Sequence, residues 1–73
     1  MTKYHIDVFY SEDDEGYIAN IPDLQYCSAF GETPQDALRE VLIAMELWLE
    51  VAQENGIKIP DAKYKPSYHQ IAQ

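Results

Sequence analysis

Apolar and polar residues alternate along two short stretches near the start of the chain. In the first stretch, 4–10, one face of an extended chain would hold Tyr4, Ile6, Val8 and Tyr10. In the second stretch, 17–21, the same face would hold Tyr17, Ala19 and Ile21. This period of two is typical of half-buried β-strands. The segment between them, 11–16, is acidic and ends in glycine, so we expect a hairpin loop and two antiparallel strands.

A proline closes the second strand, and a third strand is expected after a short turn. Pro22 has no N–H to donate to a sheet ladder, so it ends the strand before it. Asp23 and Leu24 complete the turn. The apolar residues of 26–30 then predict a third, short strand.

A well-capped helix start follows at Thr33. The Thr33 hydroxyl can accept a backbone N–H, Pro34 suits the first helical position, and Asp36 completes a capping box. We expect the helix to continue to about Asn55, because Gly56 stands where a left-handed C-terminal cap is favoured.

The segment after the helix predicts a last strand and a tail. Ile57-Lys58-Ile59 is short and β-branched at two positions, and Pro60 stops it, so we expect a fourth strand at a sheet edge. The tail, 61–73, is expected to be irregular or to dock through Tyr64 and Tyr68. The order β-β-β-α-β predicts a small α+β domain over 1–60, an antiparallel-rich sheet covered by one helix.

The predicted helix carries a wide apolar stripe at helical spacing, which we expect to face the sheet. Its members are Leu38, Val41, Leu42, Met45, Trp48, Leu49 and Ala52.

The opposite side of the helix is acidic, with two apolar residues at its centre. The acids are Asp36, Glu40, Glu50 and Glu54. Ile43 and Leu47 lie four residues apart and are therefore neighbours, and their burial at a contact would contribute roughly 3–5 kcal/mol before association costs. Scattered exposed apolar residues are also ordinary on a protein surface. Our candidate partner-binding residues are Ile43, Leu47, Glu50 and Glu54, with Asp13 and Asp14 as outer charges.

Length and charge narrow the kinds of partner. A chain of 73 residues forms one small domain, and a single cysteine cannot form an internal disulfide. Because so small a core is marginally stable alone, we expect a homodimer or higher oligomer. Thirteen acidic residues against five basic ones give a net charge of -8. Such a surface repels nucleic acid and attracts a basic protein, although it can also serve solubility alone.

The compartment is predicted from what the sequence lacks. There is no apolar run behind a basic start, and no stretch approaches the ~20 apolar residues of a membrane span. The unpaired thiol of Cys27 fits a reducing environment, so we expect a cytoplasmic protein without a membrane segment.

The sequence contains no convincing catalytic, cofactor or metal-binding motif. Cys27 could pair with His5 or His69, but no spacing favours either, and a buried, inert thiol is the simpler interpretation. The acids of 12–15 lack the spacing of a calcium loop. Asp7 stands where a nuclease of the RNase H type would need an acid, yet such catalysis requires several converging carboxylates. We expect no enzyme activity, no cofactor and no metal site.

The order of motifs resembles that of the HicB-like antitoxins, in their N-terminal domain. The chain reads Asp14-Glu15-Gly16-Tyr17, then Ile21-Pro22-Asp23-Leu24 with Cys27, then Gly31-Glu32-Thr33 with Ala37-Leu38. Further on come Ala44, Glu46, Trp48-Leu49, Asn55-Gly56 and Ile59-Pro60. The resemblance runs over about 3–60 without an insertion. Gln25 and Tyr26 stand where many members have proline and glycine, which implies a different turn before Cys27.

The resemblance implies both a fold and a function. The fold is a partial RNase H-like layer, and the function is that of a type II antitoxin, which masks a small, basic, RNA-cleaving toxin (HicA-like). Many members continue into a DNA-binding segment, and 73 residues leave no room for one, so we do not expect operator binding by this chain alone. The alternative is a stand-alone homo-oligomeric domain with no toxin partner.

Overall fold

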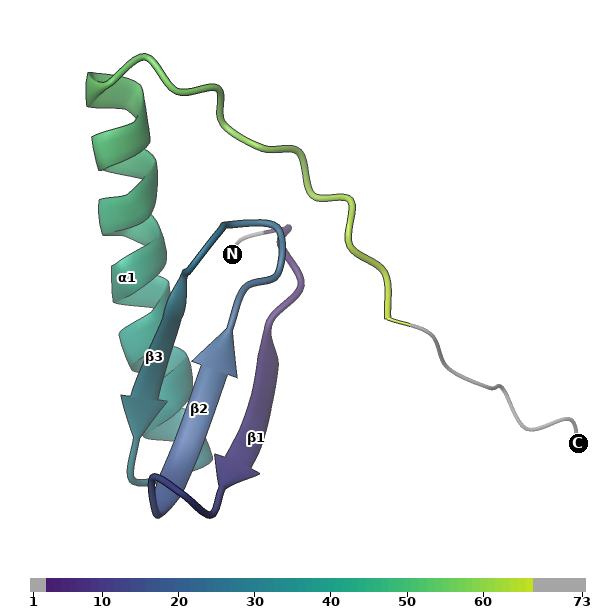
Figure 1. Ribbon diagram of the computed structural model, residues 1–73, viewed down its shortest axis with the longest axis vertical. Helices are drawn as coiled ribbons and strands as arrows, with labels where there is room; N and C mark the ends of the chain where they lie inside the picture. Colours follow the sequence, from purple (N-terminus) through teal and green to yellow (C-terminus); the bar gives the residue numbers. More distant parts are fainter. Residues whose placement is uncertain (1–2, 67–73) are drawn as a thin grey trace, which may run out of the picture.

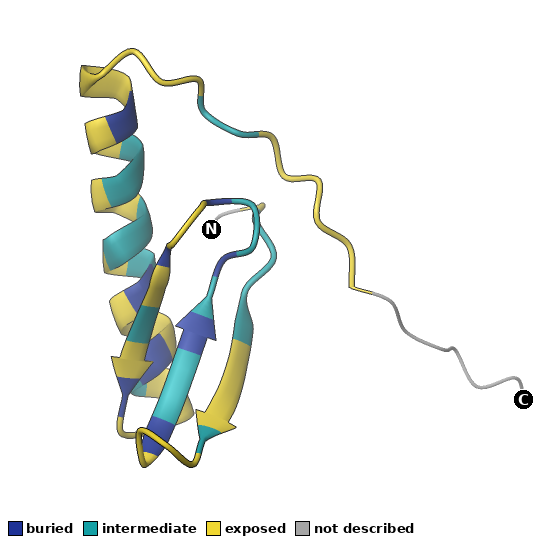
Figure 2. Ribbon diagram, in the orientation of Figure 1, coloured by how far each residue is buried: buried dark blue, intermediate teal, exposed yellow. Residues whose placement is uncertain are grey.

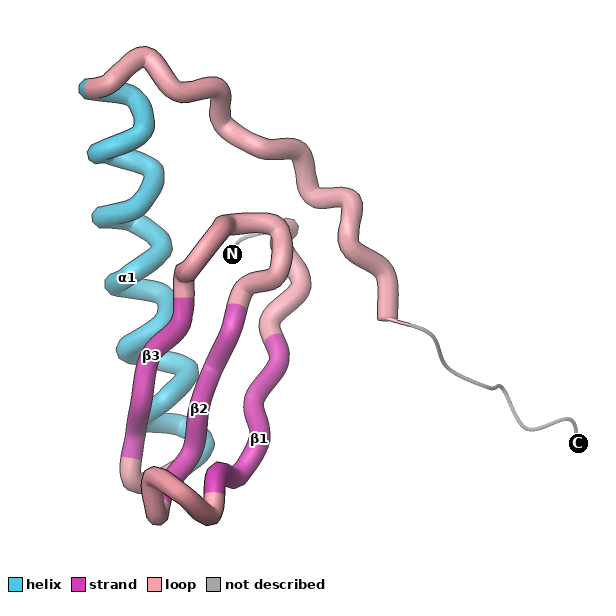
Figure 3. Tube along the Cα trace, in the orientation of Figure 1, coloured by secondary structure: helices cyan, strands magenta, loops and turns pink. Residues whose placement is uncertain are grey.

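The computed structural model describes residues 3–66 and shows three strands followed by one helix. The strands are β1 (Asp7–Ser11), β2 (Gly16–Asn20) and β3 (Ser28–Gly31), and the helix is α1 (Pro34–Glu54). The strands form one antiparallel sheet in the order β1-β2-β3, and α1 lies against one face of it (Figures 1 and 3). The predicted α+β class is confirmed, although β1 and β3 each begin a few residues later than expected.

The register of the sheet decides which residues face the helix. Val8 pairs with Ala19, and Ala19 pairs with Ala29. Because residues directly opposite each other share a face, these three side chains lie on the helix side, where Ala19 is fully buried. Phe9, Ile18 and Phe30 form the neighbouring row of partners and therefore lie on the other side, which we call the outer sheet face.

Both ends of α1 are capped as the sequence predicts. The backbone N–H of Asp36 donates to the Thr33 hydroxyl at 3.1 Å, and Pro34 stands at the start of the helix. At the other end Gly56 has a φ of +69°, and the Ile57 N–H donates back to the Ala52 carbonyl at 2.8 Å.

The core lies where α1 meets β2, β3 and the turn between them (Figure 2). Its buried residues are Ala19, Ile21, Leu24, Cys27, Ala37 and Val41. Of the stripe predicted to be core, Val41 and Ala52 are buried, whereas Leu38 is exposed. The reason is the small residue Ala37: its backbone lies directly against Gly31, so the helix approaches the sheet closely on this side and turns Leu38 outward.

The fourth strand predicted at Ile57–Ile59 is wrong, because residues 57–66 form neither strand nor helix. The 21 residues of α1 extend about 31 Å, whereas a strand of five residues extends about 17 Å. The helix therefore ends well beyond the sheet, and the chain that follows starts too far away to pair with an edge strand (Figure 1).

The chain after the helix returns across the end of the sheet and is held there by hydrogen bonds. The Tyr4 hydroxyl donates to the Pro60 carbonyl at 2.5 Å, and the Asp23 carboxylate accepts the backbone N–H groups of Lys63 and Tyr64 at 3.0–3.1 Å. Burial and the nearby carboxylates of Asp23 and Asp61 raise the pKa of Tyr4, which keeps its hydroxyl protonated as a donor. Tyr68, the other expected docking residue, lies outside the described residues.

Candidate partner-binding surface

The side of α1 that faces away from the sheet carries a continuous apolar row. Ile43, Leu47 and Val51 follow one another at four-residue spacing and are 54%, 60% and 45% exposed. Residues at this spacing form one of the ridges by which helices pack against other elements. We call these three residues the helix ridge. A ridge exposed along two helical turns is a candidate contact surface.

Acidic side chains surround the helix ridge and have no cation beside them in the last turns. Glu46, Glu50 and Glu54 are exposed, and the last turn of α1 contains no basic residue. Because the C-terminal end of a helix is already the negative end of its dipole, these carboxylates add to an existing negative potential. Arg39 lies near the start of α1, where it donates to Asp36 at 2.6 Å.

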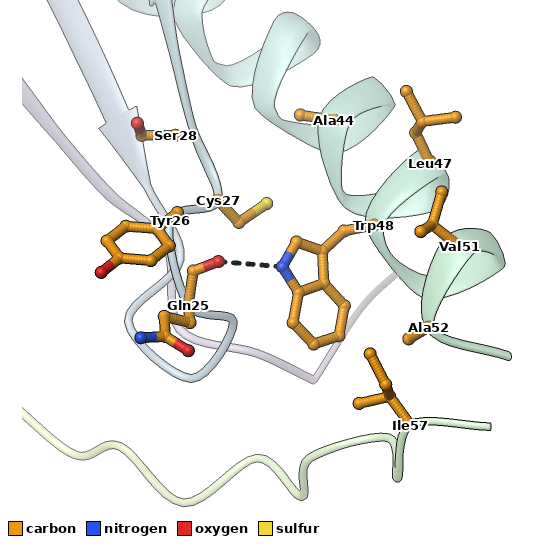
Figure 4. A pocket seen from close by; sticks show the side chains of 10 residues that line it. All are labelled: Gln25, Tyr26, Cys27, Ser28, Ala44, Leu47, Trp48, Val51, Ala52 and Ile57. Atoms are coloured by element: carbon orange, nitrogen blue, oxygen red, sulfur yellow. Dashed lines mark hydrogen bonds between the residues drawn. The ribbon is translucent and has the colours of Figure 1, made fainter. Parts of the chain in front are cut away.

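A groove of about 430 Å³ runs between the helix ridge and the turn before β3 (Figure 4). Leu47 and Val51 line it from the helix, Cys27 from the turn, Ser28 from the start of β3, and Ile57 from the chain after the helix. The Trp48 side chain lies within it, where its indole N–H donates to the Gln25 carbonyl at 2.9 Å. The groove is lined mainly by carbon atoms and continues the apolar surface of the ridge.

Tyr26 stands at the rim of this groove in an unfavourable backbone conformation. Its φ is +62° and its side chain is 92% exposed. A left-handed conformation is uncommon for a bulky residue. The expectation of a different turn before Cys27 is therefore wrong, because Tyr26 adopts the conformation that suits glycine and places an aromatic ring there.

The cysteine and histidine considered as a reactive pair are not together. Cys27 is buried, and this burial raises the pKa of its thiol, so the unreactive protonated form is favoured. His5 lies 2.5 Å from an Asp7 carboxylate oxygen and packs on the ring of Tyr64 at a centroid distance of 4.9 Å. His69 lies outside the described residues.

Acidic groups in the described chain do not converge. Within residues 3–66, no group of three or more His, Cys, Asp or Glu side chains is placed to hold a metal ion. Asp14 is engaged in the hairpin turn, where its carboxylate accepts the Ser11 hydroxyl at 2.8 Å. The same part of the chain has no helix that is long and apolar enough to cross a bilayer.

The predicted partner-binding residues fall in two separate places. Ile43, Leu47, Glu50 and Glu54 share the exposed side of α1. Asp13 and Asp14, the predicted outer charges, occupy the β1–β2 hairpin, at the end of the molecule opposite the C-terminus of α1 (Figure 1), so they lie apart from Glu50 and Glu54. Val51 was missed, although it continues the spacing of Ile43 and Leu47.

Tyr26 and Ile57 were also missed, and no local pattern in the sequence indicates them. They join the surface only because the turn before β3 and the chain after α1 meet beside Trp48.

Comparison with known proteins places the chain in a family. The model of the UPF0150-like family matches residues 3–60. The UPF0150 protein ssl0259 of Synechocystis sp. is 43% identical over 53 residues, which are 73% of each of the two chains. No solved structure matches the chain. The chain therefore belongs to the UPF0150 family.

Proposed function

We propose that this chain is a non-enzymatic binding module that holds a small basic protein against the acidic side of α1, as a HicB-like antitoxin holds its RNA-cleaving toxin. The observation that carries the proposal is the helix ridge, an exposed apolar row among carboxylates with no cation in the last turn of the helix. The lone buried thiol of Cys27 fits the cytoplasm as the place where such a partner would be met.

Apolar and charged groups have separate roles in this proposal. Burial of Ile43, Leu47 and Val51 supplies most of the affinity, because apolar area removed from water is the dominant favourable term in association. Glu46, Glu50 and Glu54 speed the encounter with a cationic surface, and they select against acidic partners. A partner rich in lysine and arginine also relieves the repulsion among these carboxylates.

The residues shared with HicB-like antitoxins support the scaffold of this surface. Leu24 is buried in the core, and Gly31 permits the close approach of Ala37. Thr33 caps the helix that carries the ridge. The motif residues therefore explain the fold, whereas the recognition of a partner depends on the exposed side of α1.

Co-expression with the product of the neighbouring reading frame tests the proposal. We expect a small, lysine-rich protein that arrests growth when expressed alone, co-purifies with this chain and is neutralised by it. Leu47→Asp should abolish both co-purification and neutralisation, because it places a charge at the centre of the ridge. Gln53→Asp adds the same charge to an exposed position of α1 outside the ridge and should leave both unchanged.

The alternative is a domain that associates only with itself through the ridge. It predicts no complex with the neighbouring protein and a lower oligomeric mass for Leu47→Asp. A neutralised partner whose complex survives Leu47→Asp would instead refute the ridge as the binding surface.

A further inference from the structure

The outer sheet face carries a row of apolar side chains that crosses all three strands. Phe9 pairs with Ile18, and Ile18 pairs with Phe30, so the three side chains are neighbours on one side of the sheet. Phe9 is 51% exposed and Phe30 is 45% exposed, while the Phe30 ring also covers Gly16. In Figure 1 the helix lies behind the strands, and this face is the one without a covering helix.

The outer sheet face has little charge, in contrast to the rest of this acidic chain. The strand residues that share it are Asp7, Phe9, Ser11, Gly16, Ile18, Asn20, Ser28 and Phe30. Asp7 is the acid among them, and its carboxylate is paired with His5. A second copy of this chain, also with a net charge of -8, is repelled by the acidic side of α1. It meets far less repulsion at the outer sheet face.

The two ends of the sheet differ in charge: the β1–β2 hairpin is acidic, whereas the opposite end mixes Lys3, Lys63 and Lys65 with Asp23 and Asp61. The hairpin between β1 and β2 contains the four consecutive acids of 12–15. Lys3 precedes β1 at the opposite end. Lys63 and Lys65 lie at that same end, because the Lys63 and Tyr64 amides are bound to Asp23 in the turn after β2.

We propose that the outer sheet face is the contact between two copies of this chain, packed face to face with their strands antiparallel. A two-fold axis perpendicular to the strands places the acidic hairpin of each copy beside the lysine end of the other. Phe9, Ile18 and Phe30 of the two copies then form an apolar layer between the sheets. This contact leaves the helix ridge free, so it is independent of the proposed function.

Sedimentation velocity on the full chain over a range of concentrations tests the contact. The unchanged chain should form dimers. Phe9→Asp and Phe30→Asp should give monomers with an unchanged circular dichroism spectrum, because both side chains are half exposed in a single copy. Leu47→Asp is the matched control, since it makes the same kind of change at a similarly exposed position on the opposite side of the molecule, and it should leave the dimer intact.

A charge exchange tests the antiparallel arrangement. Glu12→Lys with Asp13→Lys should raise the dissociation constant of the dimer roughly tenfold, and so should Lys63→Glu with Lys65→Glu. The chain that carries all four changes should regain the original affinity, which a merely misfolded variant would not do. A chain that is monomeric at every concentration, or a dimer that survives Phe9→Asp, would overturn the proposal. Four changes that weaken the dimer further would refute the antiparallel arrangement.

Discussion

The indole N–H of Trp48 donates a 2.9 Å hydrogen bond to the backbone carbonyl of Gln25, which lies 23 residues earlier in the chain. This bond ties the second half of α1 to the turn before β3. It thereby positions Leu47 and Val51, on the same part of the helix, against the groove that the turn forms. The helix ridge and the groove are held in fixed relation by one side chain.

Replacement of Trp48 by phenylalanine should lower the free energy of unfolding by about 1–2 kcal/mol. Phenylalanine keeps an aromatic ring in the groove but loses the bond to Gln25 and part of the packed area. Urea unfolding followed by circular dichroism measures the loss, because the variant has no tryptophan left for fluorescence. An unchanged unfolding midpoint would show that the bond to Gln25 does not stabilise the fold.

Replacement of Gly31 by alanine should destabilise the chain by about 2–3 kcal/mol. An added Cβ would lie 2.7 Å from the Ala37 Cα and from the Asp36 carbonyl carbon, which are backbone atoms of the helix start. The matched control is Gly56→Ala, where the space is open and only the positive φ is unfavourable, at a cost of about 1 kcal/mol. In thermal unfolding, Gly31→Ala should have a clearly lower melting temperature than Gly56→Ala. The reverse order would contradict the close contact of sheet and helix.

Replacement of Tyr26 by glycine should stabilise the chain by about 0.5–1 kcal/mol. Relief of the left-handed conformation gains roughly 1–2 kcal/mol, and the greater freedom of glycine in the unfolded chain offsets part of this gain. Tyr26→Ala keeps a Cβ at a φ of +62° and should show no comparable gain in urea unfolding. Loss of stability in Tyr26→Gly would mean that the exposed ring makes a stabilising contact.

The first turn of α1 should make stability depend on pH in the acid range. Hydrogen bonds from Arg39, the largest cause, and from Thr33 lower the pKa of Asp36. Because the folded pKa lies below the unfolded value of about 4, this contribution is present above pH ~4 and is lost as the pH falls through the folded pKa. Asp36→Asn should be less stable than the unchanged chain near neutrality, and the difference should shrink in strong acid.

Replacement of Asp23 by alanine should release the chain after the helix from the end of the sheet. The carboxylate accepts both amides that hold this segment, and charged acceptors of this kind contribute roughly 1.5–3 kcal/mol. Trypsin should therefore cut after Lys63 roughly tenfold faster in the variant, whereas Pro66 blocks cleavage after Lys65. Asp61→Ala, which removes an exposed carboxylate from the same segment, is the control and should be cut at the original rate.

Local patterns in the sequence predicted the three strands and the helix. They failed for the segment after the helix, because strand pairing there depends on long-range geometry. Thr33, Pro34 and Gly56 fix the helix ends through contacts within a few residues, so the helix was predictable. Ile57 and Ile59 are β-branched residues that favour a strand. Their distance from any sheet edge, however, follows from the length of α1, which a short stretch of sequence does not show.

The same distinction applies to the candidate site. Ile43 and Leu47 were predictable because four-residue spacing places them side by side on a helix. The distance of Asp13 and Asp14 from the helix acids was not predictable, because it depends on the directions of successive elements. The chain runs away from the hairpin along β2, returns along β3 and departs again along α1, so the acids at the end of the helix lie far from the hairpin.

The overhang of α1 beyond the sheet makes its final turns depend on supports that are remote in sequence. Beyond the strands, the helix is braced by the turn at Gln25 and by the segment that Asp23 and Tyr4 retain. Fraying of an unsupported helix end is an entropic penalty that any ligand of that end would have to overcome. If the proposed function holds, residues 60–64 can thus tune the affinity of the helix ridge for its partner without contacting that partner.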